Sequence, residues 1–143
     1  MQGRVIAITA LFVVNVVAGG CGYLQSGRWE DDPANWSRAF KSSKPEDVVV
    51  LHSLYWRAPH WTWEGGYTFE IQANPTFRKD LFGRNQLVEV PGDRNDCFNP
   101  PAWFAPRPVG SYELWGYADE PRSNFRVLVD RDSGTIFLCD YQA

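Results

Sequence analysis

Both histidines of this chain, His52 and His60, lie in residues 51–70, together with three of its seven tryptophans. Histidine is the commonest metal ligand and general base near neutral pH. Apolar and aromatic runs flank Ala58-Pro59, a dipeptide that breaks a strand, so the segment predicts a hairpin. Strand side chains alternate between the faces of a sheet, and in this hairpin the two histidines project to opposite faces. We therefore expect no metal here, because three or four ligands must converge on one ion. We also expect no other cofactor.

The register of this hairpin follows if Arg57 lies opposite His60. One face of the two strands is then almost continuously apolar, which is typical of a buried sheet face. The pairs expected on that face are Trp56 with Trp61, Leu54 with Trp63, His52 with Gly65, Val50 with Tyr67 and Val48 with Phe69. A slip at Gly65-Gly66, where a bulge forms easily, would exchange the two faces. We expect these tryptophans to be core residues, not a ligand site.

Catalytic arrangements are weakly indicated. Ser53 is next to His52, but neighbours on a strand point apart, and the chain has no G-x-S-x-G motif. Two pairs of carboxylates could serve a glycoside hydrolase, namely Glu64 with Glu70 and Asp130 with Asp132, although nothing in the sequence fixes their separation. A solvated strand face and a turn explain the same residues. The sequence therefore predicts a non-catalytic protein, with a hydrolase as the alternative.

The proline-rich segment 91–109 is the stronger candidate for a binding site. It holds five of the ten prolines, so regular secondary structure is not expected. Long irregular loops in compact domains are often functional. Phe98, Trp103, Phe104 and Arg107 give this loop the aromatic and arginine content of a binding hot spot. The alternative is a lid that folds its aromatic side chains back onto the sheet.

The first twenty residues have the composition of a targeting segment. Arg4 precedes an apolar run from Val5 to Val17, and small residues follow up to Cys21. This order is typical of a cleaved secretory signal, and the apolar run is shorter than the ~20 residues that span a bilayer. A core helix or an uncleaved anchor is the alternative. We expect residues 1–20 to be removed from the folded protein.

The end of this segment, Val17-Ala18-Gly19-Gly20-Cys21, resembles the lipobox of bacterial lipoproteins, with Ala18 where that family most often has Leu. The resemblance covers the leader alone. It implies that Cys21 becomes the mature N-terminus, carrying a diacylglyceryl thioether and an amide-linked acyl chain such as palmitate. Several acyl chains hold a protein stably on a membrane. Gly22 replaces the Asp of an inner-membrane retention signal, so the resemblance implies an outer-membrane lipoprotein on the periplasmic side.

Lipidation of Cys21 would leave two cysteines, Cys97 and Cys139. Disulfides persist in exported proteins, so we expect these two residues to be bonded. The bond would close a loop of about 43 residues and contribute roughly 4 kcal/mol in the chain-entropy model. Two unpaired buried thiols are the alternative. A bonded Cys97 would also hold the proline-rich loop in place.

The remaining pattern predicts the elements that position these residues. Asp32 and Pro33 are a typical start for a helix, which Trp36 and Phe40 continue on one face. Asn74-Pro75 predicts a second short helix, through Leu81-Phe82 and ended by Gly83, and residues 87–90 a possible short strand. The expected strands are 47–57, 61–72, 111–117, 124–130 and 135–141.

These elements predict one α+β domain over residues 31–143, after a lipidated tether over residues 21–30. We expect an antiparallel sheet of about five strands with one or two short helices on one face. The fractions of hydrophobic residues, 44%, and aromatic residues, 15%, support a core rich in large rings. The net charge of -3 is scattered along the chain, so nucleic acid is not an expected partner.

Three functions are compatible with this organisation. The first is a lipoprotein anchored in the outer membrane that binds a protein or an envelope component through its proline-rich loop. The second is an immunity or inhibitor protein that neutralises a toxin or hydrolase, which rests on class analogy alone. The third is a hydrolase acting on glycans through aromatic side chains and a carboxylate pair.

Overall fold

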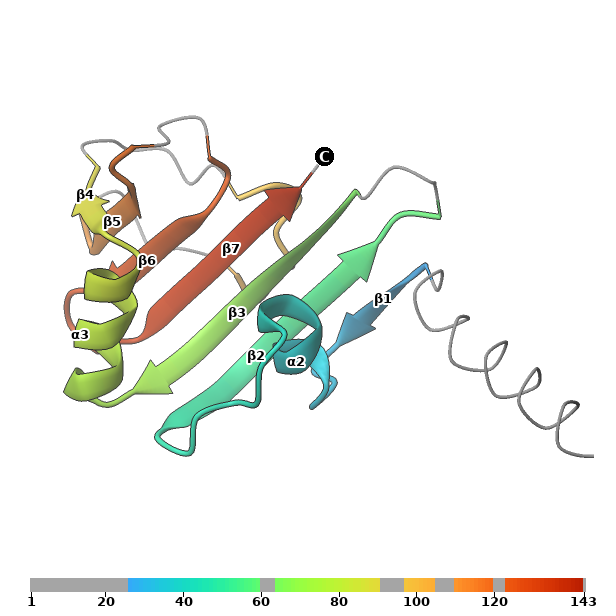
Figure 1. The fold of residues 1–143 in the computed structure, drawn as a ribbon, viewed down its shortest axis with the longest axis horizontal. Coiled ribbons are helices and arrows are strands. Elements are labelled where there is room, and N and C mark those ends of the chain that lie inside the picture. The colour runs from blue at the N-terminus through green and yellow to red at the C-terminus, as the bar shows by residue number, and fades with distance from the viewer. Residues whose placement is uncertain (1–25, 60–63, 91–96, 105–109, 120–122, 143) are drawn as a thin grey trace, which may run out of the picture.

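The structure is a computed structural model, and it describes residues 26–59, 64–90, 97–104, 110–119 and 123–142. In this part of the chain a seven-stranded antiparallel sheet, with strand order β1-β2-β3-β7-β6-β5-β4, carries two helices on one face (Figure 1). The elements are β1 Gly27–Glu30, α2 Asn35–Phe40, β2 Val48–Arg57, β3 Gly65–Ala73, α3 Pro75–Arg84, β4 Leu87–Glu89, β5 Tyr112–Tyr117, β6 Arg126–Asp130 and β7 Ile136–Gln142. The predicted α+β class is confirmed, but the expected number of strands was too low.

The strand that the sequence did not indicate is β1. Residues 27–30 were expected to belong to a tether, but they pair with β2, and Trp29 lies opposite Tyr55. The rings of Trp29 and Tyr55 are 5.9 Å apart, and the guanidinium carbon of Arg38 lies 4.9 Å from the centre of the Trp29 ring. A four-residue strand is too short to show alternation, so tertiary contacts, not periodicity, hold it on the sheet.

The register of β2 and β3 differs from the expected hairpin. His52 lies opposite Glu70 instead of Gly65, because the connection closes where the N–H of Ala58 donates to the carbonyl oxygen of Glu64, 3.0 Å away, and not at a tight turn. The register also shifts between Val50 and His52, which marks a bulge. The expected single apolar face is therefore wrong.

The bulge divides β2 between the two sides of the sheet. Val48 and Val50 belong to the core under the helices. Beyond the bulge, His52 stacks on Trp103 from the segment that crosses the opposite side. Alternation then places Leu54 and Trp56 on the side of His52. The sequence allowed a register slip at Gly65-Gly66, but the shift occurs instead at Leu51, between Val50 and His52.

The helices close one side of the sheet, here called the helix side. Trp36 and Phe40 on α2 contact each other in a tilted arrangement, with ring centres 4.5 Å apart, and both pack on Phe69 of β3. Helix α2 begins two residues later than expected, because the Asp32 carboxylate accepts the N–H of Ala34 in a turn that precedes the helix. The buried core residues on this side are Trp36, Val48, Phe69, Ile71, Leu87, Phe125, Val127, Val129, Ile136 and Leu138.

The second predicted helix is confirmed as α3. The Asn74 side chain accepts the N–H of Phe77 at 2.8 Å, and Pro75 occupies the first turn, where its missing N–H is not needed. The helix has no fully buried residue, and it packs through the half-buried Phe77, Leu81 and Phe82. Helix α3 therefore covers the sheet edge near β4 and leaves the centre to α2.

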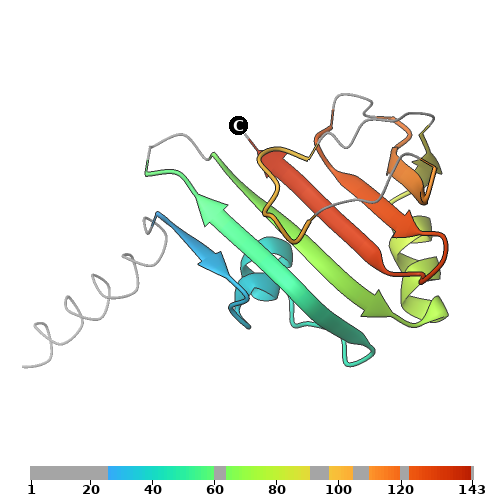
Figure 2. The same ribbon diagram turned by 180° about the vertical axis from the view of Figure 1, so that it is seen from behind.

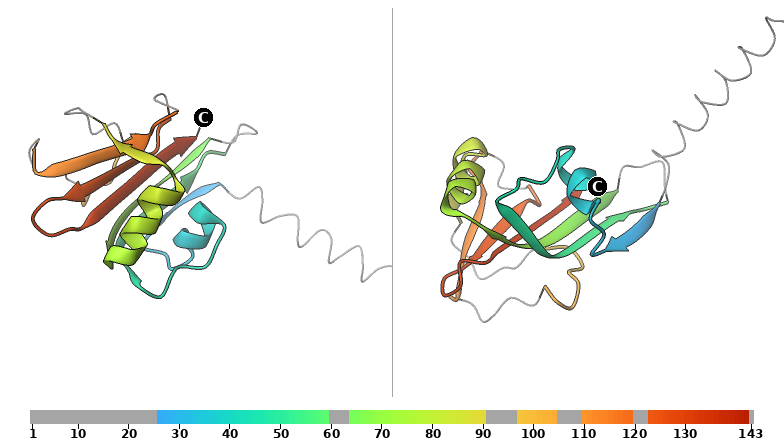
Figure 3. Two further views of the ribbon diagram at one scale, coloured as in Figure 1. Left: turned by 60° about the vertical axis from the view of Figure 1, so that its left-hand side comes forward. Right: turned by 90° about the horizontal axis from the view of Figure 1, so that it is seen from below.

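An irregular segment covers the opposite side of the sheet, here called the loop side. Residues 97–104 pass across β7 and β3 in Figure 2, and the right-hand view of Figure 3 shows them on the side away from both helices. A second buried cluster lies beneath this segment and consists of Cys97, Phe104, Leu128, Phe137 and Cys139. The sheet is therefore covered by helices on one side and by a loop on the other.

Candidate functional site

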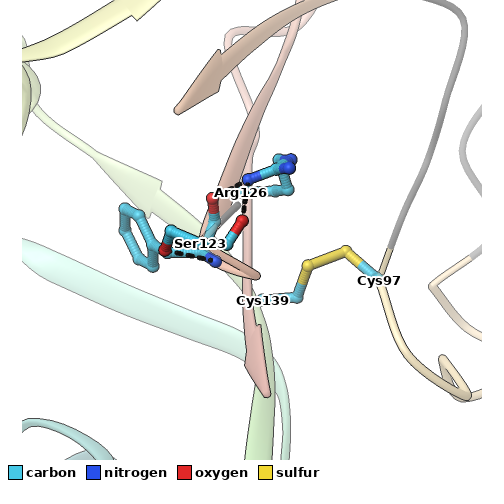
Figure 4. The surroundings of a disulfide bond; sticks show 5 residues. Cys97, Ser123, Arg126 and Cys139 are labelled. Carbon is cyan, nitrogen blue, oxygen red and sulfur yellow. Dashed lines mark hydrogen bonds between the residues drawn. A yellow bond between two sulfur atoms is a disulfide. The ribbon is translucent and has the colours of Figure 1, made fainter. Parts of the chain in front are cut away.

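A disulfide joins the loop to the middle of the sheet. Cys97 is bonded to Cys139 of β7, with their Cα atoms 5.8 Å apart, so the predicted pair lies within bonding distance. Figure 4 shows the bond beside Arg126, which lies opposite Cys139 on β6. The Arg126 guanidinium donates to the carbonyl oxygens of Ser123 and Phe125. The bond therefore attaches the loop to a strand that is paired on both edges.

The second half of the loop packs inward. Phe104 is 3% exposed, and its ring meets that of Phe137 edge to face at 5.3 Å. Trp103 is half-buried, stacks on the His52 ring at 5.3 Å, and donates from Nε1 to the Glu30 carboxylate at 3.1 Å. For this half of the loop the structure matches the lid alternative. Phe104, which the sequence suggested as a binding residue, is a core residue.

The first half of the loop presents an exposed aromatic side chain. Phe98 is 57% exposed, and its inner face stacks on Tyr141 of β7, with ring centres 4.5 Å apart. Trp56 of β2 completes the group, at 5.8 Å from Tyr141 and 6.1 Å from Phe98. We call Trp56, Phe98 and Tyr141 the aromatic stack. The fourth suggested binding residue, Arg107, lies outside the described residues, as does the suggested lipidation site Cys21.

A glycine makes the aromatic stack possible. Trp56, Gly66 and Tyr141 lie side by side in the registers of β2, β3 and β7. A Cβ on Gly66 would lie 2.9 Å from Nε1 of Trp56 and 2.8 Å from the carbonyl oxygen of Asp140. The missing side chain therefore lets the indole lie flat across β3 and reach Tyr141. From the sequence, Gly66 was expected only as a place where a bulge forms easily.

The histidine of β2 has a carboxylate partner but no nucleophile beside it. Nδ1 of His52 lies 3.2 Å from Asp31 Oδ2, while Asp31 Oδ1 accepts the N–H of Ser53 at 2.8 Å. The Ser53 hydroxyl accepts a hydrogen bond from Asn35 on the helix side. Ser53 and His52 thus point apart, as strand alternation predicts. Among the described residues no group of three or more His, Cys, Asp or Glu side chains could hold a metal ion.

The suggested carboxylate pairs have structural explanations. Asp130 is buried, and its Oδ1 accepts the N–H groups of Asp132 and Ser133 at 2.9 and 2.8 Å, which closes the turn between β6 and β7. Glu70 lies within β3, while Glu64 precedes that strand, and an extended chain separates them by about 20 Å. Glycosidase carboxylates lie roughly 5 to 9.5 Å apart, so Glu64 and Glu70 do not form such a pair.

Two titratable groups on the helix side were not found from the sequence. Burial raises the pKa of Tyr67 far above its ordinary value, and the nearby Asp140 and Tyr117 raise it further. Burial likewise raises the pKa of Asp140, against hydrogen bonds from the Tyr141 backbone and the Gln142 side chain. Strand alternation places Asp140 on the face opposite the aromatic stack. These shifts follow from neighbours on three strands, which no local pattern reveals.

The comparisons with known proteins identify no relative, since no family model, no curated protein and no solved structure gives a significant match to the chain. None of the helices in the described segments is long and apolar enough to cross a membrane. The candidate site is therefore defined by its geometry alone. It is the aromatic stack, held on the loop side by the disulfide.

Proposed function

We propose that this protein is a lipoprotein anchored in the outer membrane through Cys21, with a non-catalytic periplasmic domain that binds a component of the envelope. The sequence of residues 1–21 supports the anchor, because it combines a basic start, a short apolar run and a lipobox-like end. One observation supports the binding role: the exposed Phe98 is fixed on the sheet surface by ring stacking and by the neighbouring disulfide.

A rigid aromatic surface is well suited to binding. A side chain that is already ordered loses little entropy when a partner arrives. The disulfide at Cys97 is next to Phe98 in sequence, and Trp103 and Phe104 fix the other end of the same loop. The binding surface is therefore the exposed start of the loop. Its buried end is the support.

The experiment measures the anchor and the surface separately. Cys21→Ser should move the protein from the membrane fraction to the soluble fraction, and mass spectrometry of the wild type should show an acylated N-terminus. Phe98→Ala should leave the anchor intact and weaken the association of the protein with its envelope component, measured by cross-linking in intact cells. Val49→Ala is the matched control, because Val49 is similarly exposed, at 55%, on the other end of β2.

Two results would contradict the proposal. A wild-type protein without an acylated N-terminus would disprove the anchor. An unchanged cross-linking pattern in Phe98→Ala would disprove the binding surface, whatever the state of Cys21. A Trp103→Ala, Phe104→Ala variant is less informative, because both side chains contact the sheet and their loss would disturb the loop itself.

A further inference from the structure

We propose that the aromatic stack, together with Arg28, docks on the surface of the bilayer that carries the lipid anchor. This inference rests on the proposed function, since it takes the anchor at Cys21 as given and names the envelope component. The membrane interface would then hold the domain at two points: the acyl chains on Cys21 and the outer face of Phe98. Five observations lead to it.

The aromatic stack lies at the end of the sheet where the chain enters. Gly27 begins β1 opposite Arg57 of β2, which lies opposite Gly65 of β3, which in turn lies opposite Gln142 of β7. Figure 1 shows these four strand ends at one end of the sheet, toward the upper right. A set of residues that pair across neighbouring strands is here called a row. Trp56 and Tyr141 of the aromatic stack lie on the next row, one residue further into the sheet.

That row extends to the first strand. Arg28 of β1 lies opposite Trp56, which lies opposite Gly66, which lies opposite Tyr141. Arg28 is exposed, and strand pairing puts it on the same side of the sheet as Trp56. The loop side therefore presents, on one row near the chain entry, an arginine, a tryptophan and a tyrosine. Phe98 stacks on the tyrosine and lies tilted against the tryptophan.

The chain between the anchor and the sheet is short. Because β1 begins at Gly27, only residues 22–26 separate it from Cys21, and five to six extended residues reach about 20 Å at most. The row from Arg28 to Tyr141 crosses three strand spacings, which is about 14 Å. The anchor thus restricts the domain to orientations in which this end of the sheet is near the bilayer.

The chemistry of the row fits the bilayer interface. Tryptophan and tyrosine concentrate at this depth because their rings are apolar and their N–H or O–H groups remain in contact with water. Arginine binds lipid phosphate groups. A basic residue near an anionic membrane raises the membrane-binding constant about fivefold. On the same side of the sheet, the carboxylate of Glu30, two residues further along β1 than Arg28, accepts a hydrogen bond from Trp103.

The opposite end of the sheet has the contrary character. Val49 and Leu51 are exposed there, beside a groove of about 430 Å³ whose charged lining residues are Asp31, Asp32, Glu46 and Lys44, a set with more carboxylates than cations. Anionic lipids repel such carboxylates. This end lies about 23 Å along β2 from Trp56, so it would face away from the membrane. Val49 therefore provides an internal control for contact with lipid.

The test is photo-cross-linking in intact cells, with p-benzoylphenylalanine in place of Phe98 or in place of Val49 in the full-length chain. We expect phospholipid adducts, identified by mass, several-fold more abundant at position 98 than at position 49. Arg28→Glu should lower the yield at position 98 by at least about fivefold and leave the protein in the membrane fraction. Arg28→Lys should retain most of the yield.

Each other outcome overturns the inference. Protein adducts at position 98 without lipid adducts would replace the bilayer by a protein partner and leave the proposed function standing. Equal lipid yields at both positions, or none at either in a membrane-bound protein, would mean that the aromatic stack does not dock. A wild-type chain absent from the membrane fraction would remove the anchor, and with it both the proposed function and this inference.

Discussion

The helix side and the loop side of the sheet are covered in different ways. On the helix side, α2 and α3 cover the strands with rings that contact one another, such as Trp36, Phe40 and Phe69. On the loop side, residues 97–104 form no helix or strand, and within them the N–H of Phe104 donates to the carbonyl oxygen of Pro101 at 2.9 Å. A loop that is not held by the hydrogen bonds of a helix or a sheet needs another constraint, and here the disulfide supplies it.

This difference has a consequence for function. The helix side buries its aromatic residues, and in the described part of the chain its core leaves no ring comparable to Phe98 in exposure. The loop side is fixed at Cys97, Trp103 and Phe104, and between these points it holds an exposed ring in a defined place. Under the proposed function, the helix side is the source of stability and the loop side is the place for binding. Variants on both sides test this division, from the largest expected effect to the smallest.

The largest effect is expected from Phe69→Ala. Phe69 is fully buried and contacts Trp36, Phe40 and Tyr67, so its removal leaves a cavity between a helix and the centre of the sheet. Such a change lowers the free energy of unfolding by about 3 to 5 kcal/mol. Phe104→Ala should cost less, because the loop can collapse into the space. Urea unfolding of both variants measures the difference.

A Phe104→Ala variant as unstable as Phe69→Ala would contradict this division. It would show that the loop belongs to the same cooperative core as the helices. A matched control is Phe98→Ala, which removes the same side chain from an exposed position of the same loop. Its cost should be the smallest of the three.

Removal of the disulfide should come next. A Cys97→Ser, Cys139→Ser double variant should lose about 2 to 4 kcal/mol of unfolding free energy, because the bond closes a long loop, with a sequence separation of 42. The loss should be local in its first effects. Hydrogen exchange should rise in residues 97–104, while β3 and β7 keep their protection. Increased exchange throughout α2 and β3 at native conditions would show that the two sides are not independent.

The division also explains what the sequence could predict. The helix side follows local rules: Asn74-Pro75 starts α3, and Trp36 and Phe40 are spaced to share one face of α2. The disulfide followed from the cysteine count and from the export that residues 1–20 predict. Strand alternation located β3, β5, β6 and β7 within a few residues. The helices and these strands depend on residues that are neighbours in sequence, and the disulfide depends on one pair of cysteines.

The register of β2 and the content of the site could not be predicted in this way. The bulge at Leu51 and the long connection after Arg57 depend on how β2 fits both β1 and β3, and a shift by an odd number of residues exchanges the faces. Tyr141 was expected only as the end of a strand. It joins Trp56 because Gly66 lies between them, an arrangement of three strands that one strand's pattern does not contain.

Gly66→Ala should sharpen the comparison within the loop side. The added methyl group would lie under 3 Å from the indole of Trp56 and from the backbone of β7, so either the ring or the strand must move. We expect a loss of about 1 to 3 kcal/mol and a change in the near-ultraviolet circular dichroism of the aromatic stack. Gly83→Ala is the control, because a Cβ there meets no atom within 4 Å. An unchanged aromatic signal in Gly66→Ala would mean that Trp56 does not lie over β3.

The smallest expected effects come from two carboxylates that respond to pH in opposite directions. Burial raises the pKa of Asp140, so ionisation of this carboxyl lowers the free energy of unfolding. This loss of stability is complete above the folded-state pKa of Asp140 and disappears as the pH falls through that value.

Asp32 behaves in the opposite way. The hydrogen bond from the Ala34 N–H, and then that from the Arg38 side chain, lower the pKa of Asp32. The stability that ionised Asp32 contributes is therefore lost as the pH falls through its lowered pKa. At pH about 7, Asp140→Asn should therefore raise the unfolding free energy slightly, and Asp32→Asn should lower it slightly. Both effects should be small because water screens the two carboxylates. Urea unfolding at pH about 7 and again in acid measures both, and the gain from Asp140→Asn should disappear in acid. If Asp140→Asn still raises the unfolding free energy in acid, the Asp140 side chain is unfavourable because of its shape and not because of its charge. Burial beside Tyr67 would then not oppose the ionisation of Asp140.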